Sequence, residues 1–211
     1  EDILTNQNYI SKGIVLDKLI ESLIISDIDI NDIIVGDKNA LLIASRVLGY
    51  GKDYTFRGFS KIEGGLKDFE VDLTTLKDKI LSKKDLKEEG INQFDFILPA
   101  TKTSITFKLI THKDEKNIEK EIAGQNKIRP GSNPEITTRL KYVITSIEGD
   151  SEKKTIREFV DKQILAKDSR ALREEIVRIS PDVILKHHGE DGEEDVAIPI
   201  NLTFFWPDAR I

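Results

Sequence analysis

The fold is decided by Val196-Ala-Ile-Pro-Ile-Asn-Leu-Thr-Phe-Phe-Trp-Pro-Asp208, near the end of the chain. Its alternating apolar residues predict an extended strand with one buried face, ended by Pro207. The apolar row consists of Val196, Ile198, Ile200, Leu202, Phe204 and Trp206. On such a strand Phe205 points to the opposite face, so either a helix of this chain or a partner protein must cover a large aromatic side chain.

Two β-hairpins are predicted upstream of this strand. The first occupies about 53–73, with a glycine-bearing turn at 61–65. The second occupies about 93–110, where apolar and polar residues alternate on both sides of a turn at 99–102. We also expect residues 183–185 to pair with the terminal strand.

Apolar residues at helical spacing predict the helices. The expected helices cover about 16–24, 37–48, 74–82, 111–123, 134–147, 155–164 and 168–180. Asn133-Pro134 favours a helix start, and Thr155-Ile-Arg-Glu158 has the sequence of a capping box. The helix near 111 has acidic residues in its first turn and few apolar ones, so we expect it to be mostly solvated.

The predicted fold class is α+β, with antiparallel hairpins, a helical lobe and a C-terminal strand that returns to the sheet. We expect a helix pair and a hairpin-rich lobe in 1–126, and a linker at 127–134 where Pro, Gly, Ser and Asn gather. A helical lobe then occupies 135–182. The C-terminal hairpin, 183–211, packs back on the hairpin-rich lobe.

The composition excludes several classes of function. The 211 residues contain no cysteine, so neither a disulfide nor a thiolate metal site can form, which fits a reducing compartment. The net charge is −6, opposite to that of proteins that bind the nucleic-acid backbone. No apolar run approaches the roughly 20 residues of a membrane-spanning helix, and no signal peptide is visible. We therefore expect no nucleic-acid partner and no membrane span.

His187, His188 and the acidic residues that follow them form the one cluster with metal-ligand chemistry. Adjacent residues of a strand point to opposite faces, so the two imidazoles cannot reach one ion without a turn between them. The chain has three histidines and lacks the motifs of hydrolases, phosphate-binding loops and dinucleotide sites. We expect no enzymatic activity, metal, cofactor or small-molecule substrate. A metal-binding or enzymatic domain at His187 and His188 is the alternative.

Several side chains are candidate contacts with a partner protein, because Arg and aromatic residues are frequent in interface hot spots. In the first hairpin these are Arg57 and Phe59. The first helix contributes an exposed side with Leu16 and Leu23, and the terminal strand contributes Phe204, Phe205 and Trp206.

Several segments resemble the T4-type phage baseplate hub assembly proteins in order and spacing. The segments are Asp37–Gly51, Phe69-Glu-Val-Asp-Leu73, Leu98-Pro99 leading into Ile105–Thr111 with Asp114-Glu115, and Ile198–Asp208. The Phe-Phe-Trp-Pro ending is the distinctive motif, and the resemblance extends over most of the chain from about residue 33.

This resemblance implies a non-enzymatic structural or assembly protein of a contractile-tailed phage. Such a protein acts at the central hub of the baseplate, through contacts with other hub or wedge proteins. The implied locations are the host cytoplasm during assembly and the tail baseplate of the virion. A host-encoded interaction module unrelated to phage is a further alternative.

The chain departs from the family at two places. Many members have paired cysteines that resemble a zinc ribbon near the first hairpin and again before the terminal strand. Here the corresponding places hold Arg57-Gly-Phe-Ser60 and His187-His-Gly-Glu190. We therefore expect both hairpins to be closed by turn chemistry and packing without a metal.

Overall fold

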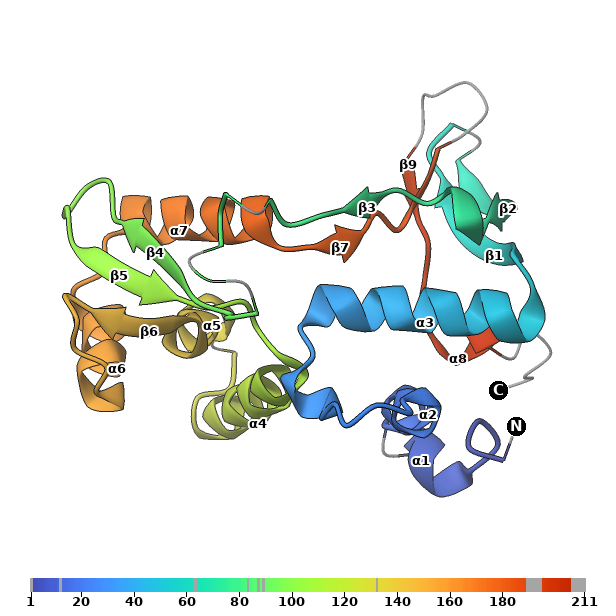
Figure 1. Cartoon of the computed structure of the whole chain (residues 1–211), viewed down its shortest axis with the longest axis horizontal. Helices are drawn as coiled ribbons and strands as arrows, with labels where there is room; N and C mark the ends of the chain where they lie inside the picture. The colour runs from blue at the N-terminus through green and yellow to red at the C-terminus, as the bar shows by residue number, and fades with distance from the viewer. Residues whose placement is uncertain are drawn as a thin grey trace. The chain divides into compact units, whose positions relative to one another are not determined.

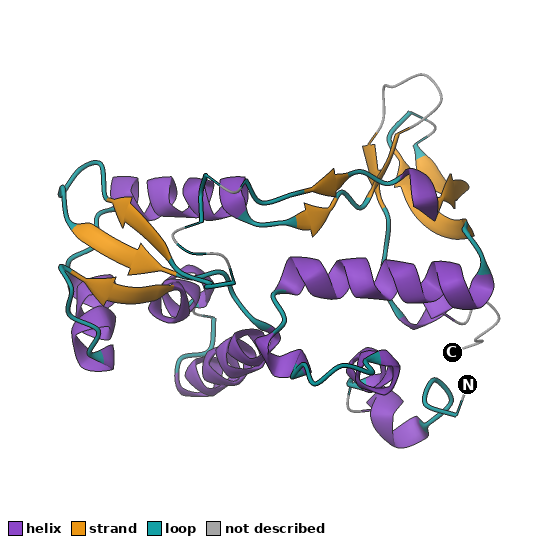
Figure 2. Ribbon diagram, in the orientation of Figure 1, coloured by secondary structure: helices purple, strands orange, loops and turns teal. Residues whose placement is uncertain are grey.

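The computed structural model describes residues 2–11, 13–62, 64–82, 84–86, 88, 90–131, 133–188 and 195–205. The chain has an α+β fold of helices and small antiparallel sheets, as predicted (Figures 1 and 2). It forms two compact units, which we describe separately. Unit 1 comprises residues 1–30, 36–79 and 181–211, and unit 2 comprises residues 31–35 and 80–180.

The described residues form the following elements, labelled as in Figure 1. The α-helices are α1 (Gln7–Ser11), α2 (Val15–Leu23), α3 (Val35–Tyr50), α4 (His112–Ile128), α5 (Glu135–Val143), α6 (Lys153–Lys162), α7 (Ala166–Ile179) and α8 (Leu202–Phe205). The strands are β1 (Asp53–Ser60), β2 (Gly65–Asp72), β3 (Asp78–Lys79), β4 (Phe94–Ile97), β5 (Ser104–Phe107), β6 (Ile144–Ile147), β7 (Asp182–Val183), β8 (Lys186–His188) and β9 (Asp195–Ala197). Short 3₁₀ helices cover Ile30–Asp32 and Leu73–Thr75.

Unit 2 contains the second predicted hairpin, extended by a third strand. Strands β4 and β5 pair around the predicted turn at 99–102, with Phe94 opposite Phe107. Strand β6 pairs with the other edge of β5, placing Ile147 opposite Ile105. The sequence predicted one helix as far as 147, but α5 ends at Val143. The segment Ile-Thr-Ser-Ile is rich in β-branched residues, which suit a strand beside an open sheet edge.

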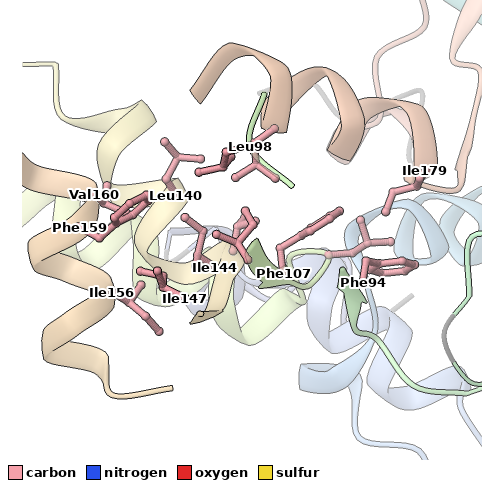
Figure 3. Packing of buried hydrophobic residues seen from close by; sticks show 14 residues of the cluster. Phe94, Leu98, Phe107, Leu140, Ile144, Ile147, Ile156, Phe159, Val160 and Ile179 are labelled. Atoms are coloured by element: carbon pink, nitrogen blue, oxygen red, sulfur yellow. The ribbon is translucent and has the colours of Figure 1, made fainter. Parts of the chain in front are cut away.

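The core of unit 2 is formed between this sheet and helices α5, α6 and α7 (Figure 3). The ring centroids of Phe94 and Phe107 lie 5.5 Å apart. The buried cluster consists of Phe94, Leu98, Ile105, Phe107, Leu109, Leu140, Val143, Ile144, Ile147, Ile156, Phe159, Val160, Leu172 and Ile179. Hairpin and helices therefore share one core.

The expected boundary at 127–134 does not separate the units. Helix α4 continues through Gly124 to Ile128, and the second hairpin belongs with the helices that follow. The boundaries fall near 30–36, 79–80 and 180–181 instead. The Pro, Gly, Ser and Asn residues correctly predicted a loop. They could not show that the hairpin before this loop and the helices after it bury their apolar faces against each other.

Helix starts in unit 2 agree only partly with the sequence. Thr111 and Asp114 form a reciprocal capping box at the start of α4. The capping box expected at Thr155 does not form, because that hydroxyl donates to Asp150 and the helix has already begun at Lys153. Helix α7 likewise begins before Asp168, whose carboxylate is buried and accepts from the backbone N–H groups of Ala100 and Thr101.

Unit 1 contains the first predicted hairpin. Strands β1 and β2 pair along their whole length, from Asp53 opposite Asp72 to Ser60 opposite Gly65. Strand β9 approaches β1 so closely that a Cβ built on Gly58 would lie 2.7 Å from Cγ1 of Val196. The C-terminal hairpin therefore packs back on the first hairpin, and glycine is required at the point of contact.

The terminal strand is much shorter than predicted. Strand β9 ends at Ala197, and residues 202–205 form the short helix α8. Pro199 has no N–H to continue a ladder, and the Asn201 side chain accepts from the backbone N–H and hydroxyl of Thr203 at 3.0 and 2.6 Å. Both Phe204 and Phe205 are consequently buried, whereas a strand would have turned one of them outward.

Other pairings and helices in unit 1 also differ from the prediction. Strand β9 pairs with β8, and the Ile198 N–H donates to the carbonyl oxygen of Leu185, so one residue of 183–185 bonds to the terminal segment as predicted. Val183 instead pairs with Asp78 in the small β3–β7 sheet. The helix expected at 74–82 is replaced by a single 3₁₀ turn followed by β3. Helix α2 buries Val15 and Ile20 as an amphipathic helix should, but it also buries Asp17, which pairs with Lys38 at 2.6 Å.

Candidate functional site

Among the residues that the structure describes, one face of the hairpin β1–β2 is covered by other segments and the other face is exposed. Successive strand residues alternate between faces, and the burial of Tyr54 and Phe56 alternates with the exposure of their neighbours. Cross-strand partners on the uncovered side are Phe59 and Leu66, Arg57 and Asp68, Thr55 and Glu70, and Asp53 and Asp72. We call these residues the outer face.

The end of the outer face near the turn is apolar. Phe59 is 58% exposed and its cross-strand partner Leu66 is 67% exposed. Ile62, in the turn itself, is also exposed. Large apolar side chains that lie next to one another in water are characteristic of protein-contact sites.

The next pair of the outer face is charged. The side chains of Arg57 and Asp68 are 71% and 72% exposed, and Nε lies 3.9 Å from Oδ1. An ion pair this exposed contributes little to folding, on the order of 0–1 kcal/mol. Both groups therefore remain available to hydrogen-bond a partner protein.

The base of the outer face is acidic and firmly held. Lys52 lies 2.6 Å from Asp72, whose carboxylate also accepts from the backbone N–H of Thr74. The Lys52 ammonium, followed by the Thr74 hydroxyl and N–H, lowers the pKa of Asp72 to about 2. The base therefore carries a carboxylate at any physiological pH.

The opposite, inner face anchors the hairpin. Tyr54 packs edge-on against Phe204 with ring centroids 4.7 Å apart, and burial raises the pKa of its phenol. Phe205 meets Phe204 in the same way at 5.2 Å. Arg46 of α3 is buried and donates to the carbonyl oxygens of Gly51 and Asp53, where the chain enters β1. The outer face is thus presented on a supported strand pair.

Some of the predicted contact residues are exposed in the structure and others are buried. Arg57 and Phe59 lie together on the outer face, as neighbours along β1. Phe204 and Phe205 are buried in the chain and support the inner face instead of offering a free surface. Trp206 lies outside the described residues.

The two candidates from the first helix belong to another surface. On α2, Leu16 is half-buried and Leu23 is exposed. Sequence reasoning missed Leu66 and Asp68, although counting the strand register outward from the turn at 61–65 could have identified both as cross-strand partners.

The histidine pair does not assemble a metal site among the residues described. His187 packs against the ring of Phe69 at 5.5 Å, whereas Nδ1 of His188 lies 2.6 Å from Oδ1 of Asp195. Lys186, followed by His188, lowers the pKa of Asp195. In the described part of the chain no three His, Asp or Glu side chains gather as metal ligands, and loop 189–194 lies outside it.

Comparisons with known proteins leave the family undetermined. No family model, curated protein or solved structure matches this chain at a significant level.

None of the helices described has the length and apolar character needed to cross a membrane.

Proposed function

We propose that this chain is a non-enzymatic assembly protein of the central baseplate hub of a contractile-tailed phage. In this proposal it contacts other hub or wedge proteins through its outer face, in the host cytoplasm and in the baseplate. The observation that carries the contact role is the uncovered Phe59–Leu66 pair beside an exposed Arg57. The resemblance of the Asp37–Gly51 and Ile198–Asp208 segments to hub assembly proteins supports the phage setting.

The physical argument rests on what a partner would gain. Covering Phe59 and Leu66 removes apolar surface from water, worth about 25 cal/mol per Å². Arg57 lies beside them, and an arginine flanked by apolar groups is a frequent hot-spot residue. The strand pairing fixes the backbone that carries these side chains, so association loses little backbone conformational entropy.

The test is an affinity pull-down of the tagged full chain from cells producing the parent phage, with partners identified by mass spectrometry. We expect recovery of tail-hub proteins, and an approximately tenfold loss for the double variant Phe59→Ser and Leu66→Ser. The matched control is Leu48→Ser, which changes an exposed leucine on α3. Circular dichroism verifies that each variant is folded.

Two results would overturn the proposal. One is recovery of no tail protein from a lysate in which the hub is demonstrably present. The other is equal recovery by the wild-type chain and the folded double variant, which would show that the outer face is not the contact surface.

A further inference from the structure

We propose that the outer face also binds a second copy of this chain, in competition with a hub or wedge protein, paired face to face about a two-fold axis parallel to the strands. The inference rests on the proposed function only in treating the outer face as a protein-contact surface. Its basis is the cross-strand register of β1 and β2 together with the charges of their outward side chains.

Symmetry specifies which residues would meet. A two-fold axis running between the two hairpins, along the strands, lays β1 of one copy over β2 of the other. Each outer-face residue then faces the residue that is its own cross-strand partner, but in the second copy. Phe59 therefore faces Leu66 of the second copy, and Arg57 faces Asp68 of the second copy.

Three of the four rows of the outer face are complementary to themselves in this arrangement. The first row joins apolar side chains from both copies, Phe59 and Leu66. The second row brings Arg57 and Asp68 from each copy together. Each guanidinium then has two carboxylates beside it, one from Asp68 of its own copy and one from Asp68 of the second copy. The third row sets uncharged Thr55 against Glu70. No like charges face each other in these three rows. In the fourth row Asp53 faces Asp72 of the second copy, where the Lys52 that pairs with each Asp72 offsets part of the repulsion.

The opposite orientation is unfavourable. If the axis ran across the strands, the turn end of one copy would meet the base of the other. The apolar pair Phe59 and Leu66 would then lie over Asp53 and Asp72. These apolar side chains would take water from two carboxylates, of which Asp72 has Lys52 as its cation. The arrangement of charges thus selects the orientation with turn ends together.

The pairing should be weak. Three rows of a two-stranded ribbon cover only about 200 Å² per copy, from strand spacings near 4.8 Å and a rise near 3.3 Å per residue. Stable complexes usually cover about 800 Å² per partner. Association should therefore appear at high protein concentration, as it would where many copies assemble together.

A charge-exchange experiment on the purified full chain tests the pairing. Arg57→Asp leaves carboxylates at both 57 and 68, and Asp68→Arg leaves guanidinium groups at both, so each variant repels itself. An equimolar mixture restores Arg–Asp contacts between unlike copies. By sedimentation velocity, we expect each variant alone to associate about tenfold more weakly than wild type, and the mixture to recover to within a few-fold of it. Circular dichroism verifies folding.

Cross-linking gives a second readout, because the chain has no cysteine of its own. One population carries Thr55→Cys and a differently tagged one carries Glu70→Cys, which leaves the first two rows intact. Facing sheets lie about 10 Å apart, so a maleimide cross-linker of about that span is suitable. We expect efficient mixed cross-links, and only background levels for a Leu48→Cys pair on α3.

The outcomes separate this inference from the proposed function. A mixture no better associated than either variant alone, together with cross-linking at the control level, would overturn the second-copy pairing. Hub capture in the pull-down could persist in that case. Conversely, pairing of purified protein without any hub capture would overturn the phage role and leave the pairing intact.

Discussion

The two hairpins with similar sequence patterns have different surroundings in the fold. In β4–β5, strand β6 adds to one edge and Phe94, Ile105 and Phe107 are buried under helices (Figure 3). In β1–β2 the inner face is covered, but Phe59 and Leu66 remain in water. Alternation therefore predicts a strand with two faces, whereas other segments of the chain decide whether one face stays open.

The comparison shows where a contact function can be placed. In β4–β5 the one exposed large apolar side chain is Ile97, and its cross-strand partner is Ser104, so this hairpin has no exposed apolar pair to offer a partner. The hairpin β1–β2 is firmly held on its inner face and still has an uncovered apolar pair outside. The following predictions test this contrast, from the largest expected effect to the smallest.

Removing Phe107 should have the largest effect on stability. The side chain is fully buried beside Phe94, so Phe107→Ala should lower the free energy of unfolding by about 3–5 kcal/mol. Urea unfolding monitored by circular dichroism measures the change. Ile97→Ala, an exposed site on β4 of the same hairpin, should change stability by less than about 0.5 kcal/mol. Equal effects of the two substitutions would contradict the burial described for this hairpin.

Asp168→Asn should destabilise the turn of β4–β5. The buried carboxylate accepts from the backbone N–H groups of Ala100 and Thr101 at 2.7 and 3.1 Å. The side-chain amide of Asn has one oxygen and can accept only one of these hydrogen bonds well. We therefore expect the free energy of unfolding to fall by about 2 kcal/mol at neutral pH. Ser169→Asn, next along α7, is a control. Urea unfolding at neutral pH measures the change. A midpoint urea concentration of Asp168→Asn equal to that of wild type would contradict this role.

The pH dependence of the same residue has a definite sign. Burial alone would raise the pKa of Asp168, but the hydrogen bonds from Ala100 and Thr101 bring it below its ordinary value of 3.8. The folded state therefore binds protons less readily than the unfolded state, and this part of stability is present above 3.8 and lost as the pH falls through the folded pKa. Urea midpoints between pH 6 and pH 2.5 should fall less steeply for Asp168→Asn than for wild type.

Gly58→Ala should damage the covered face of β1–β2. The added Cβ would lie 2.7 Å from Val196 and 3.1 Å from Phe69, so we expect a loss of about 1–2 kcal/mol through overpacking. Gly65→Ala is the matched control, because a Cβ there meets nothing within 4 Å. Thermal unfolding of both variants measures the difference. If the two glycines tolerated alanine equally well, β9 would not be packed against β1 as described.

Changing the outer face should have the smallest effect on folding. Phe59 and Leu66 are mostly in water, so the double change to Ser should alter the free energy of unfolding by less than about 1 kcal/mol. Urea unfolding is again the measurement. A loss comparable to that of Phe107→Ala would show that these side chains stabilise the fold, and the case for a contact surface would be lost.

Much of the local structure could be predicted from the sequence. Both hairpins were predicted because alternation and a turn sequence lie within a few residues of each other, as at 61–65 and 99–102. Arg57 and Phe59 were identified as contact candidates from their residue types, and the period of β1 places both on one face. These features depend on near neighbours in the chain.

Elements that depend on distant partners were mispredicted. The end of α5 became strand β6 because β5 had an open edge beside it. The terminal strand gave way to α8, which buries Phe204 against Tyr54 of the inner face and Phe205 against Phe204. No local pattern reports an open edge or a free apolar surface elsewhere in the chain.

The sequence by itself determined the α+β class, the turns of the two hairpins and which residues of β1 share a face, because backbone geometry sets a period of two along any strand. Only the tertiary structure decided which face is covered. Burial requires a second surface, and that surface is supplied by segments more than a hundred residues away, such as Val196 over Gly58 and Phe204 against Tyr54.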